Sequence, residues 1–112
     1  PHNIQQYTRI NTHHISLYAK FIERLANTPD GDGSLLDHSI LLYGTGMGDG
    51  DNHTPYNLPI VLMGGGCGEL EGGRHLKYEL HTPFMNLGLS LLDKVGVNLA
   101  NLSDSTGRLS EL

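Results

Sequence analysis

The chain has 112 residues, of which 38% are hydrophobic and 17% charged, so it is long enough for one domain with a core and is not of disordered composition. Its net charge of −5 and its scattered lysines and arginines lack the clustered basic surface that nucleic-acid binding requires. No run reaches the roughly 18 apolar residues of a membrane span. A single cysteine, Cys67, excludes an internal disulfide.

An apolar stripe predicts a long amphipathic helix over residues 3–27. Apolar and aromatic side chains recur there at three- and four-residue steps, the period of a helix with one buried face. The stripe consists of Ile4, Tyr7, Ile10, His14, Leu17, Tyr18, Phe21, Ile22 and Leu25. Pro29 ends the helix, because a proline disfavours helical backbone at the residue before it. We expect His14 to be a core histidine with one hydrogen-bond partner.

Two continuous apolar runs predict strands over residues 39–43 and 58–63. Runs without alternation are typical of strands covered on both faces, the usual situation in a parallel sheet. Residues 74–80 alternate polar and apolar side chains, which indicates a half-exposed strand or an edge hairpin. Between the first helix and the first strand, residues 28–34 have the composition of a turn.

A second helix is predicted to begin at Thr82 and Pro83, with threonine as the N-cap and proline at the first helical position. We expect its buried face to comprise Phe84, Leu87, Leu91, Leu92 and Val95. Gly96 suits the left-handed position after the last turn, and residues 104–108 read as a polar turn.

The order of these elements predicts an α/β fold, layered, with a mostly parallel sheet and flanking helices. Two central strands would leave sheet edges uncovered. We therefore expect residues 1–112 to form either a single domain completed by a partner chain or a fragment of a larger α/β domain.

The loop that follows the first predicted strand is the main candidate site. Residues 44–53 alternate glycines with polar residues and carry two carboxylates and an imidazole, those of Asp49, Asp51 and His53. Ligands gather beyond the carboxyl ends of strands in open α/β sheets, and such side chains bind divalent metals such as zinc or manganese. The other interpretation is a surface loop whose Asp and Asn residues stabilise turns. The sequence leaves both open.

Residues 30–34, Asp-Gly-Asp-Gly-Ser, resemble the opening of a calcium loop, and Asp37 offers a further carboxylate. The glutamate expected at the twelfth position is absent, because Leu41 stands there. The alternative is a turn in which Ser34 caps the next few residues. Dinucleotide-binding, phosphate-loop and serine-hydrolase signatures are absent, and Cys67 reads as a small buried or loop thiol.

Several motifs occur in one order along nearly the whole chain. They are Asp30-Gly-Asp-Gly-Ser-Leu-Leu-Asp-His-Ser, Leu42-Tyr-Gly-Thr-Gly-Met-Gly-Asp-Gly, His53 with Asn57-Leu-Pro, Gly64-Gly-Gly, Gly73-Arg-His and Asp104-Ser-Thr-Gly-Arg-Leu. This ordered set resembles the C-terminal part of a bacterial family, domain of unknown function fifteen fifty-two. The resemblance implies a fragment of a longer protein exported to the periplasm or the cell exterior, commonly through a twin-arginine signal.

That family is distantly similar to the alkaline phosphatase and sulfatase superfamily, which implies the C-terminal portion of an alkaline-phosphatase-like fold. In the superfamily a strand ends in a metal-binding Asp-His pair, and a further histidine precedes the next strand. The matching strand end here is Gly46-Met47, so the pair is absent, whereas His53 falls where the later histidine would.

Two functional hypotheses follow. The first is a non-catalytic or incomplete portion of an alkaline-phosphatase-like protein, whose partner is the remaining N-terminal part or another copy of the chain. The second is a metal-dependent hydrolase of phosphate or sulfate esters that uses zinc, manganese or calcium at Asp49, Asp51 and His53.

Overall fold

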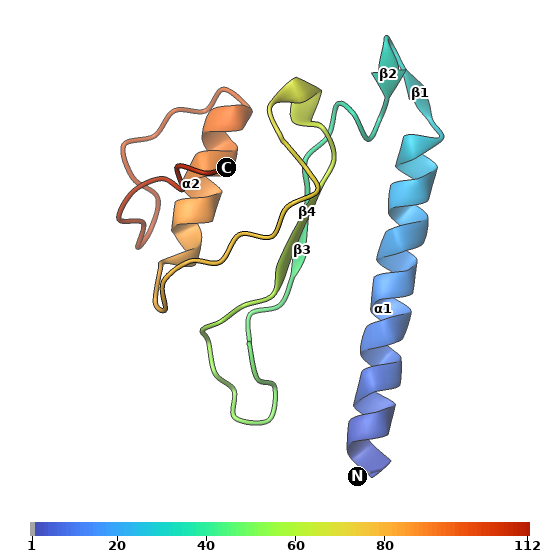
Figure 1. Ribbon diagram of the computed structural model, residues 1–112, viewed down its shortest axis with the longest axis vertical. Helices are drawn as coiled ribbons and strands as arrows, with labels where there is room; N and C mark the ends of the chain where they lie inside the picture. Colours follow the sequence, from blue (N-terminus) through green and yellow to red (C-terminus); the bar gives the residue numbers. More distant parts are fainter. Residues whose placement is uncertain (1) are drawn as a thin grey trace.

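The computed structural model describes residues 2–112, which form two long helices, a 3-10 turn and four short strands (Figure 1). In chain order these are α1 (His2–Ala26), β1 (Pro29–Asp30), β2 (Gly33–Ser34), β3 (Leu41–Gly44), β4 (Ile60–Met63), η1 (Gly66–Gly68) and α2 (Phe84–Lys94). The predicted turn over residues 28–34 contains the β1–β2 hairpin.

The predicted first helix is confirmed as α1, but its apolar stripe is mostly exposed. Within residues 2–112 the C-terminal part packs most closely on the rest of the chain, with Ile22 buried and Tyr18 and Leu25 half-buried. Nearer the N-terminus, the Tyr7 hydroxyl lies beside Gly50. Between these two parts of α1, His14 is exposed. The expectation of a core histidine is therefore wrong, since no other element within residues 2–112 covers that part of α1. None of the described helices is both long and apolar enough to cross a membrane.

The expectation of a layered, mostly parallel sheet, as in an alkaline-phosphatase-like fold, is wrong. The predicted strands form where expected, but β3 and β4 pair antiparallel, with Leu41 opposite Met63 and Gly44 opposite Ile60. Parallel neighbours need a crossover connection, usually a helix. Residues 45–59, which join β3 to β4, contain no helix and bring the chain straight back. Within residues 2–112 the sheets are two separate antiparallel pairs, β1–β2 and β3–β4.

Each face of the β3–β4 sheet is covered over one strand only. The register puts Tyr43 and Val61 on one face, where the Tyr43 ring stacks on Tyr18 of α1. Val61 and Met63 on the same face remain 44% and 38% exposed. On the other face Leu62 is half-buried while Leu42 is exposed. The expectation of strands covered on both faces is therefore wrong, because α1 lies over β3 and the C-terminal half lies over β4.

Residues 74–80 form neither the predicted half-exposed strand nor an edge hairpin, because they have no ladder partner within the described chain. The alternation on which the prediction rested is nevertheless real. Leu76 and Tyr78 are half-buried, whereas His75, Lys77 and Glu79 are exposed. Side chains alternate in this way in any extended backbone, and a strand needs backbone hydrogen bonds to a neighbour as well.

The second predicted helix is confirmed as α2, and it holds the most deeply buried residues, with Leu89 1% exposed. The predicted buried face is wrong in part, because Phe84 and Val95 are 38% and 61% exposed and Leu89 was not included. Its predicted start is wrong in detail. Pro83 is the N-cap, and the Thr82 hydroxyl instead donates to the Glu79 carbonyl at 2.8 Å. The end is as predicted: Gly96 has φ +79° and its N–H donates to the Asp93 carbonyl.

The C-terminal tail folds back over α2 through side-chain hydrogen bonds (Figure 1). The Asn86 amide both donates to the Thr106 hydroxyl, at 3.2 Å, and accepts from the Thr106 N–H, at 2.8 Å. Ser90 accepts from the Leu109 N–H at 2.8 Å. These bonds satisfy two buried polar side chains of α2. The predicted polar turn lies in this tail, where the Ser105 hydroxyl accepts from the Leu102 N–H.

Candidate functional site

The β3–β4 loop, residues 45–59, is closed at its base by a short backbone bridge. Gly48 N–H donates to the Thr54 carbonyl at 2.9 Å, and Thr54 N–H donates to the Asp49 carbonyl at 3.1 Å. The Asp49 N–H also donates to the Thr54 hydroxyl at 3.1 Å. A Cβ atom on Gly48 would collide with the Tyr56 carbonyl. The glycine at position 48 is therefore required for the two sides of the loop to approach each other.

The Asp49 carboxylate is occupied by hydrogen bonds within its own loop. One oxygen accepts from the N–H groups of Asp51, at 2.9 Å, and Asn52, at 3.2 Å. The other accepts from the Asn52 side-chain amide at 2.7 Å. These bonds, that of the Asn52 side chain first, hold the pKa of Asp49 below its usual range. Asp49 thus acts as an ionised turn former, the interpretation that the sequence left open beside metal binding.

The other two expected metal ligands lie on the same loop without binding each other. Asp51 and His53 are exposed, and within residues 2–112 neither side chain makes a hydrogen bond or an ion pair. His53 has a left-handed backbone, φ +53°, and is close enough to help lower the pKa of Asp49. Across the described part of the chain no three His, Cys, Asp or Glu side chains converge as a metal site requires. The three residues therefore share a loop but do not form a coordination sphere.

The residues that resembled a calcium loop form a different cluster. His38 Nδ1 lies 2.9 Å from an Asp30 carboxylate oxygen, and His38 Nε2 lies 3.2 Å from an Asp32 carboxylate oxygen. A neutral imidazole carries only one N–H, so both contacts are hydrogen bonds only when the ring is protonated. The hydrogen bond that His38 donates to Asp30, assisted by the charge of both carboxylates, raises the pKa of His38. These two carboxylates therefore favour the protonated form of the His38 imidazole between them.

Asp37, the further carboxylate of that hypothesis, serves as a turn acceptor. One of its oxygens accepts from the Ser34 hydroxyl, at 2.7 Å, and from the Ser34 N–H, at 2.8 Å. The Ser34 hydroxyl in turn accepts weakly from the Asp37 N–H at 3.3 Å. The side-chain bond from Ser34 is the main cause of a lowered pKa at Asp37. The turn with Ser34 as its cap, the alternative interpretation of the sequence, is the arrangement observed.

Sequence reasoning missed the pairing of His38 with Asp30 and Asp32. The pairing depends on the tight turn of residues 28–38. The Leu35 N–H donates to the Thr28 carbonyl at 2.9 Å, and this turn places His38 beside the β1–β2 hairpin that carries Asp30 and Asp32.

The remaining residues of chemical interest are apart from one another. Cys67 is exposed, and within residues 2–112 its thiol makes one hydrogen bond, to the His38 carbonyl at 3.9 Å. It lines a small surface pocket together with Asp32, Asp37 and His38. The rings of His81 and Tyr56 meet edge to face, with their centroids 5.6 Å apart. Met47 is 45% exposed.

Comparison of the chain with protein-family models, with curated proteins and with solved structures finds no match. The resemblance to domain of unknown function fifteen fifty-two therefore stays a prediction from the ordered motifs, and the function has to be argued from the chain itself.

Proposed function

We propose that this chain is a non-catalytic part of an exported protein of the family that it resembles, more distantly related to the alkaline phosphatases, and that it acts as a binding or structural module. The observation that supports this most directly is the use of the Asp49 carboxylate. Three donors of its own loop already bind the two oxygens of Asp49.

A carboxylate offers about four acceptor positions, so three of those on Asp49 are already used. A metal that took them would leave the N–H groups of Asp51 and Asn52 without partners and would dissolve the turn that they close. The free energy of binding would have to offset that loss. Asp49 is therefore better suited to shaping the loop than to holding a cation.

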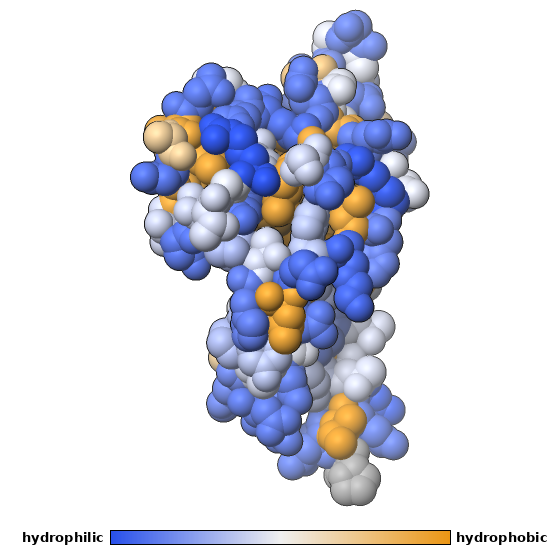
Figure 2. All heavy atoms as spheres, turned by 60° about the vertical axis from the view of Figure 1, so that its left-hand side comes forward, coloured by the Kyte–Doolittle hydropathy of each residue, from blue (hydrophilic) through white to orange (hydrophobic). Residues whose placement is uncertain are grey.

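The exposed apolar side chains support a module that packs on another polypeptide. On α1, Ile10, Leu17 and Phe21 are 54%, 49% and 49% exposed. On the sheet, Val61 and Met63 are also exposed. Figure 2 shows apolar atoms gathered in patches between polar ones on one side of the molecule. Monomeric proteins rarely leave large apolar patches uncovered, so we propose the remainder of the polypeptide or another copy as the partner.

Calorimetric titration with Zn²⁺ and with Mn²⁺ at neutral pH tests the non-catalytic assignment. The proteins are the wild type, His53→Ala and the control His13→Ala, which removes an exposed histidine of α1. We expect no stoichiometric binding that requires His53. Binding of one metal per chain that is lost in His53→Ala and retained in His13→Ala would overturn the proposal.

The alternative, a metal-dependent hydrolase of phosphate or sulfate esters, is favoured by one observation. The lowered pKa keeps Asp49 ionised at neutral pH, and His53 lies close enough to contribute to that shift. A metal on this loop would activate water for attack on the ester. Turnover of p-nitrophenyl phosphate or sulfate in the presence of zinc, manganese or calcium, lost in both Asp49→Asn and His53→Ala, would establish this alternative. We expect no such turnover.

A further inference from the structure

A large groove separates β4 from the C-terminal half of the molecule. It has a volume of about 1240 Å³ and runs between residues 55–64 on one side and residues 70–84 on the other, with α2 and the tail beyond. Ligand pockets usually enclose roughly 300–1,000 Å³, so this groove has room for an elongated molecule. Asp49, Asp51 and His53 do not line it, which makes a ligand there independent of the function proposed above.

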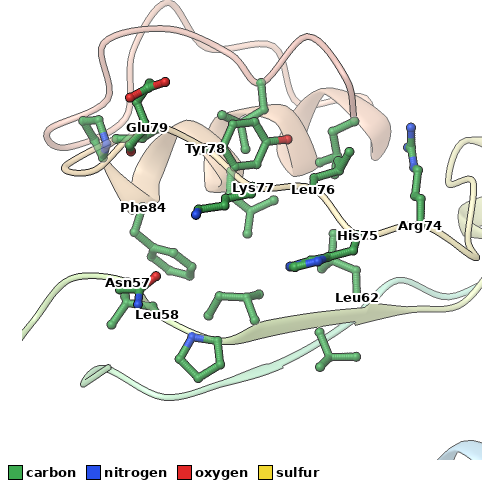
Figure 3. Close-up of a pocket in the computed structure, with 18 of the residues that line it drawn as sticks. Asn57, Leu58, Leu62, Arg74, His75, Leu76, Lys77, Tyr78, Glu79 and Phe84 are labelled. Carbon is green, nitrogen blue, oxygen red and sulfur yellow. The ribbon is translucent and has the colours of Figure 1, made fainter. Parts of the chain in front are cut away.

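Both sides of the groove carry apolar side chains. Leu58 and Leu62 line it from the β4 side, and Phe84, at the start of α2, lines it from the opposite side. In Figure 3 the Phe84 ring points into the space between the two sides. Phe84 is 38% exposed and Leu58 and Leu62 are half-buried. An apolar group that fills such a recess removes apolar surface from contact with water. The gain in free energy is proportional to the area removed.

Two nitrogen-bearing side chains face the same space. His75 and Lys77 are two residues apart on an extended segment, so they project to the same side of it. Figure 3 shows both pointing into the groove, whereas the side chains of Arg74 and Glu79, which also line it, are directed outward. Within residues 2–112 neither His75 nor Lys77 has a carboxylate within ion-pairing distance.

Three carboxylates line the groove, those of Glu71, Glu79 and Asp104, and within residues 2–112 none of them forms an ion pair with Lys77. Glu71 lies 3.9 Å from the Arg74 guanidinium and is engaged with it. Glu79 points away from the groove (Figure 3). Asp104 lines the groove from the tail, and within residues 2–112 it forms no ion pair with Lys77. The Lys77 ammonium is thus a hydrogen-bond donor beside an apolar wall, free to bind an anion.

We propose that this groove binds an anionic amphiphile, a molecule with an elongated apolar body and one carboxylate head. The body lies against Leu58, Leu62 and Phe84, and the head accepts hydrogen bonds from Lys77 Nζ and from a ring nitrogen of His75. An apolar recess with a few convergent polar groups is the usual constitution of a small-molecule site. The charge on Lys77 selects an acid over an alcohol or a cation of the same length.

Calorimetric titration of the full chain with decanoate tests the proposal. Decanol and decyltrimethylammonium serve as matched probes with a neutral and a cationic head. We expect saturable binding of one decanoate per chain and much weaker binding of the other two. Lys77→Gln removes the charge at an exposed position and should weaken decanoate binding about tenfold, the loss expected for one charge-assisted hydrogen bond. Arg74→Gln, which changes a cation that points away, should bind as the wild type does.

Nonspecific adsorption to the exposed apolar side chains of α1 is the competing explanation. Phe21→Gln, on α1, removes part of that surface and should leave decanoate affinity unchanged. Circular dichroism checks that each variant keeps its helices. Equal affinity for the three probes, or equal affinity of Lys77→Gln and the wild type for decanoate, would overturn the proposal. So would a larger loss in Phe21→Gln than in Lys77→Gln.

Discussion

The rings of Tyr18 and Tyr43 stack with centroids 4.8 Å apart and planes inclined by 26°. This pair joins α1 to β3, and Tyr18 belongs to the short part of α1 that packs most closely on the rest of the chain. The Tyr18 hydroxyl is buried, and within residues 2–112 it has no hydrogen-bond partner. Burial accordingly raises the pKa of Tyr18.

Tyr18→Phe and Tyr18→Ala separate the contribution of the ring from that of the hydroxyl. The phenylalanine keeps the stack and removes a buried polar group without a partner, so we expect unchanged stability or a gain of up to about 1 kcal/mol. The alanine loses the aromatic pair and should cost at least about 1 kcal/mol. Urea unfolding followed by circular dichroism measures both. Equal losses in the two variants would show that the hydroxyl, not the ring, stabilises the contact.

His38 makes the stability of the β1–β2 region depend on pH. Its pKa in the folded protein is raised above the ordinary 6.5 by Asp30. A raised folded-state pKa means that the stabilisation is fully present below pH 6.5 and is lost as the pH rises through the folded-state value. We expect NMR titration to give a pKa for His38 above that of histidine in an unstructured peptide.

The Asp30→Asn variant should bring the pKa of His38 down, because it removes the largest cause of the increase. Asp51→Asn changes an exposed carboxylate that makes no hydrogen bond with its side chain within residues 2–112, and it serves as the control. An unchanged His38 titration in Asp30→Asn would contradict the arrangement described above.

Arg108 and Asp93 fasten the C-terminal tail to α2 through two hydrogen bonds, and Arg108 also donates to the Leu99 carbonyl at 2.8 Å. Arg108 lowers the pKa of Asp93 below 3.8. This stabilisation is present above pH 3.8 and is lost as the pH falls through the folded-state pKa. We expect Arg108→Lys to destabilise the protein at pH 7, because lysine cannot form the paired bonds. The difference in stability between Arg108→Lys and the wild type should disappear as the pH falls through the folded-state pKa of Asp93, which acid denaturation measures. A stability difference that stays constant at every pH would contradict this role of the Arg108–Asp93 pair.

Two glycines of the β3–β4 loop should respond differently to alanine. A Cβ atom at Gly48 would collide with the Tyr56 carbonyl, whereas at Gly46 it would meet nothing within 4 Å. Neither glycine has a positive φ, so steric overlap alone distinguishes them. We expect Gly48→Ala to cost about 1–3 kcal/mol and Gly46→Ala to be nearly neutral. Thermal unfolding measures the difference, and similar melting temperatures would show that the loop closes in another way.

Local features of the chain were predictable because they depend on local physics. The period of the stripe predicted α1, the apolar runs located β3 and β4, and Gly96 marked the end of α2 at a left-handed residue. Each of these depends on backbone preferences and side-chain spacing within a few residues. The wrong prediction of Thr82 as the N-cap also has a local cause. The Thr82 hydroxyl donates to the Glu79 carbonyl, and this bond competes with capping.

The place of the candidate residues in the fold was predictable, but the arrangement of their side chains was not. The loop does follow β3, and Asp49, Asp51 and His53 lie on it. Whether their side chains converge depends on the fold of the loop, in which the Asp49 carboxylate turns inward to its own backbone. Residue types alone allow both a turn and a metal site, because the same oxygens serve either purpose.

By itself, then, the sequence determined where the helices and central strands lie and which loop carries the acidic and imidazole groups. Only the tertiary structure decided that β3 and β4 run antiparallel, that most of the α1 stripe is left uncovered, and that His38 lies between Asp30 and Asp32. The physical reason is the range of the interactions. Periodicity acts over one turn or one strand, whereas pairing direction and burial depend on which distant segments meet.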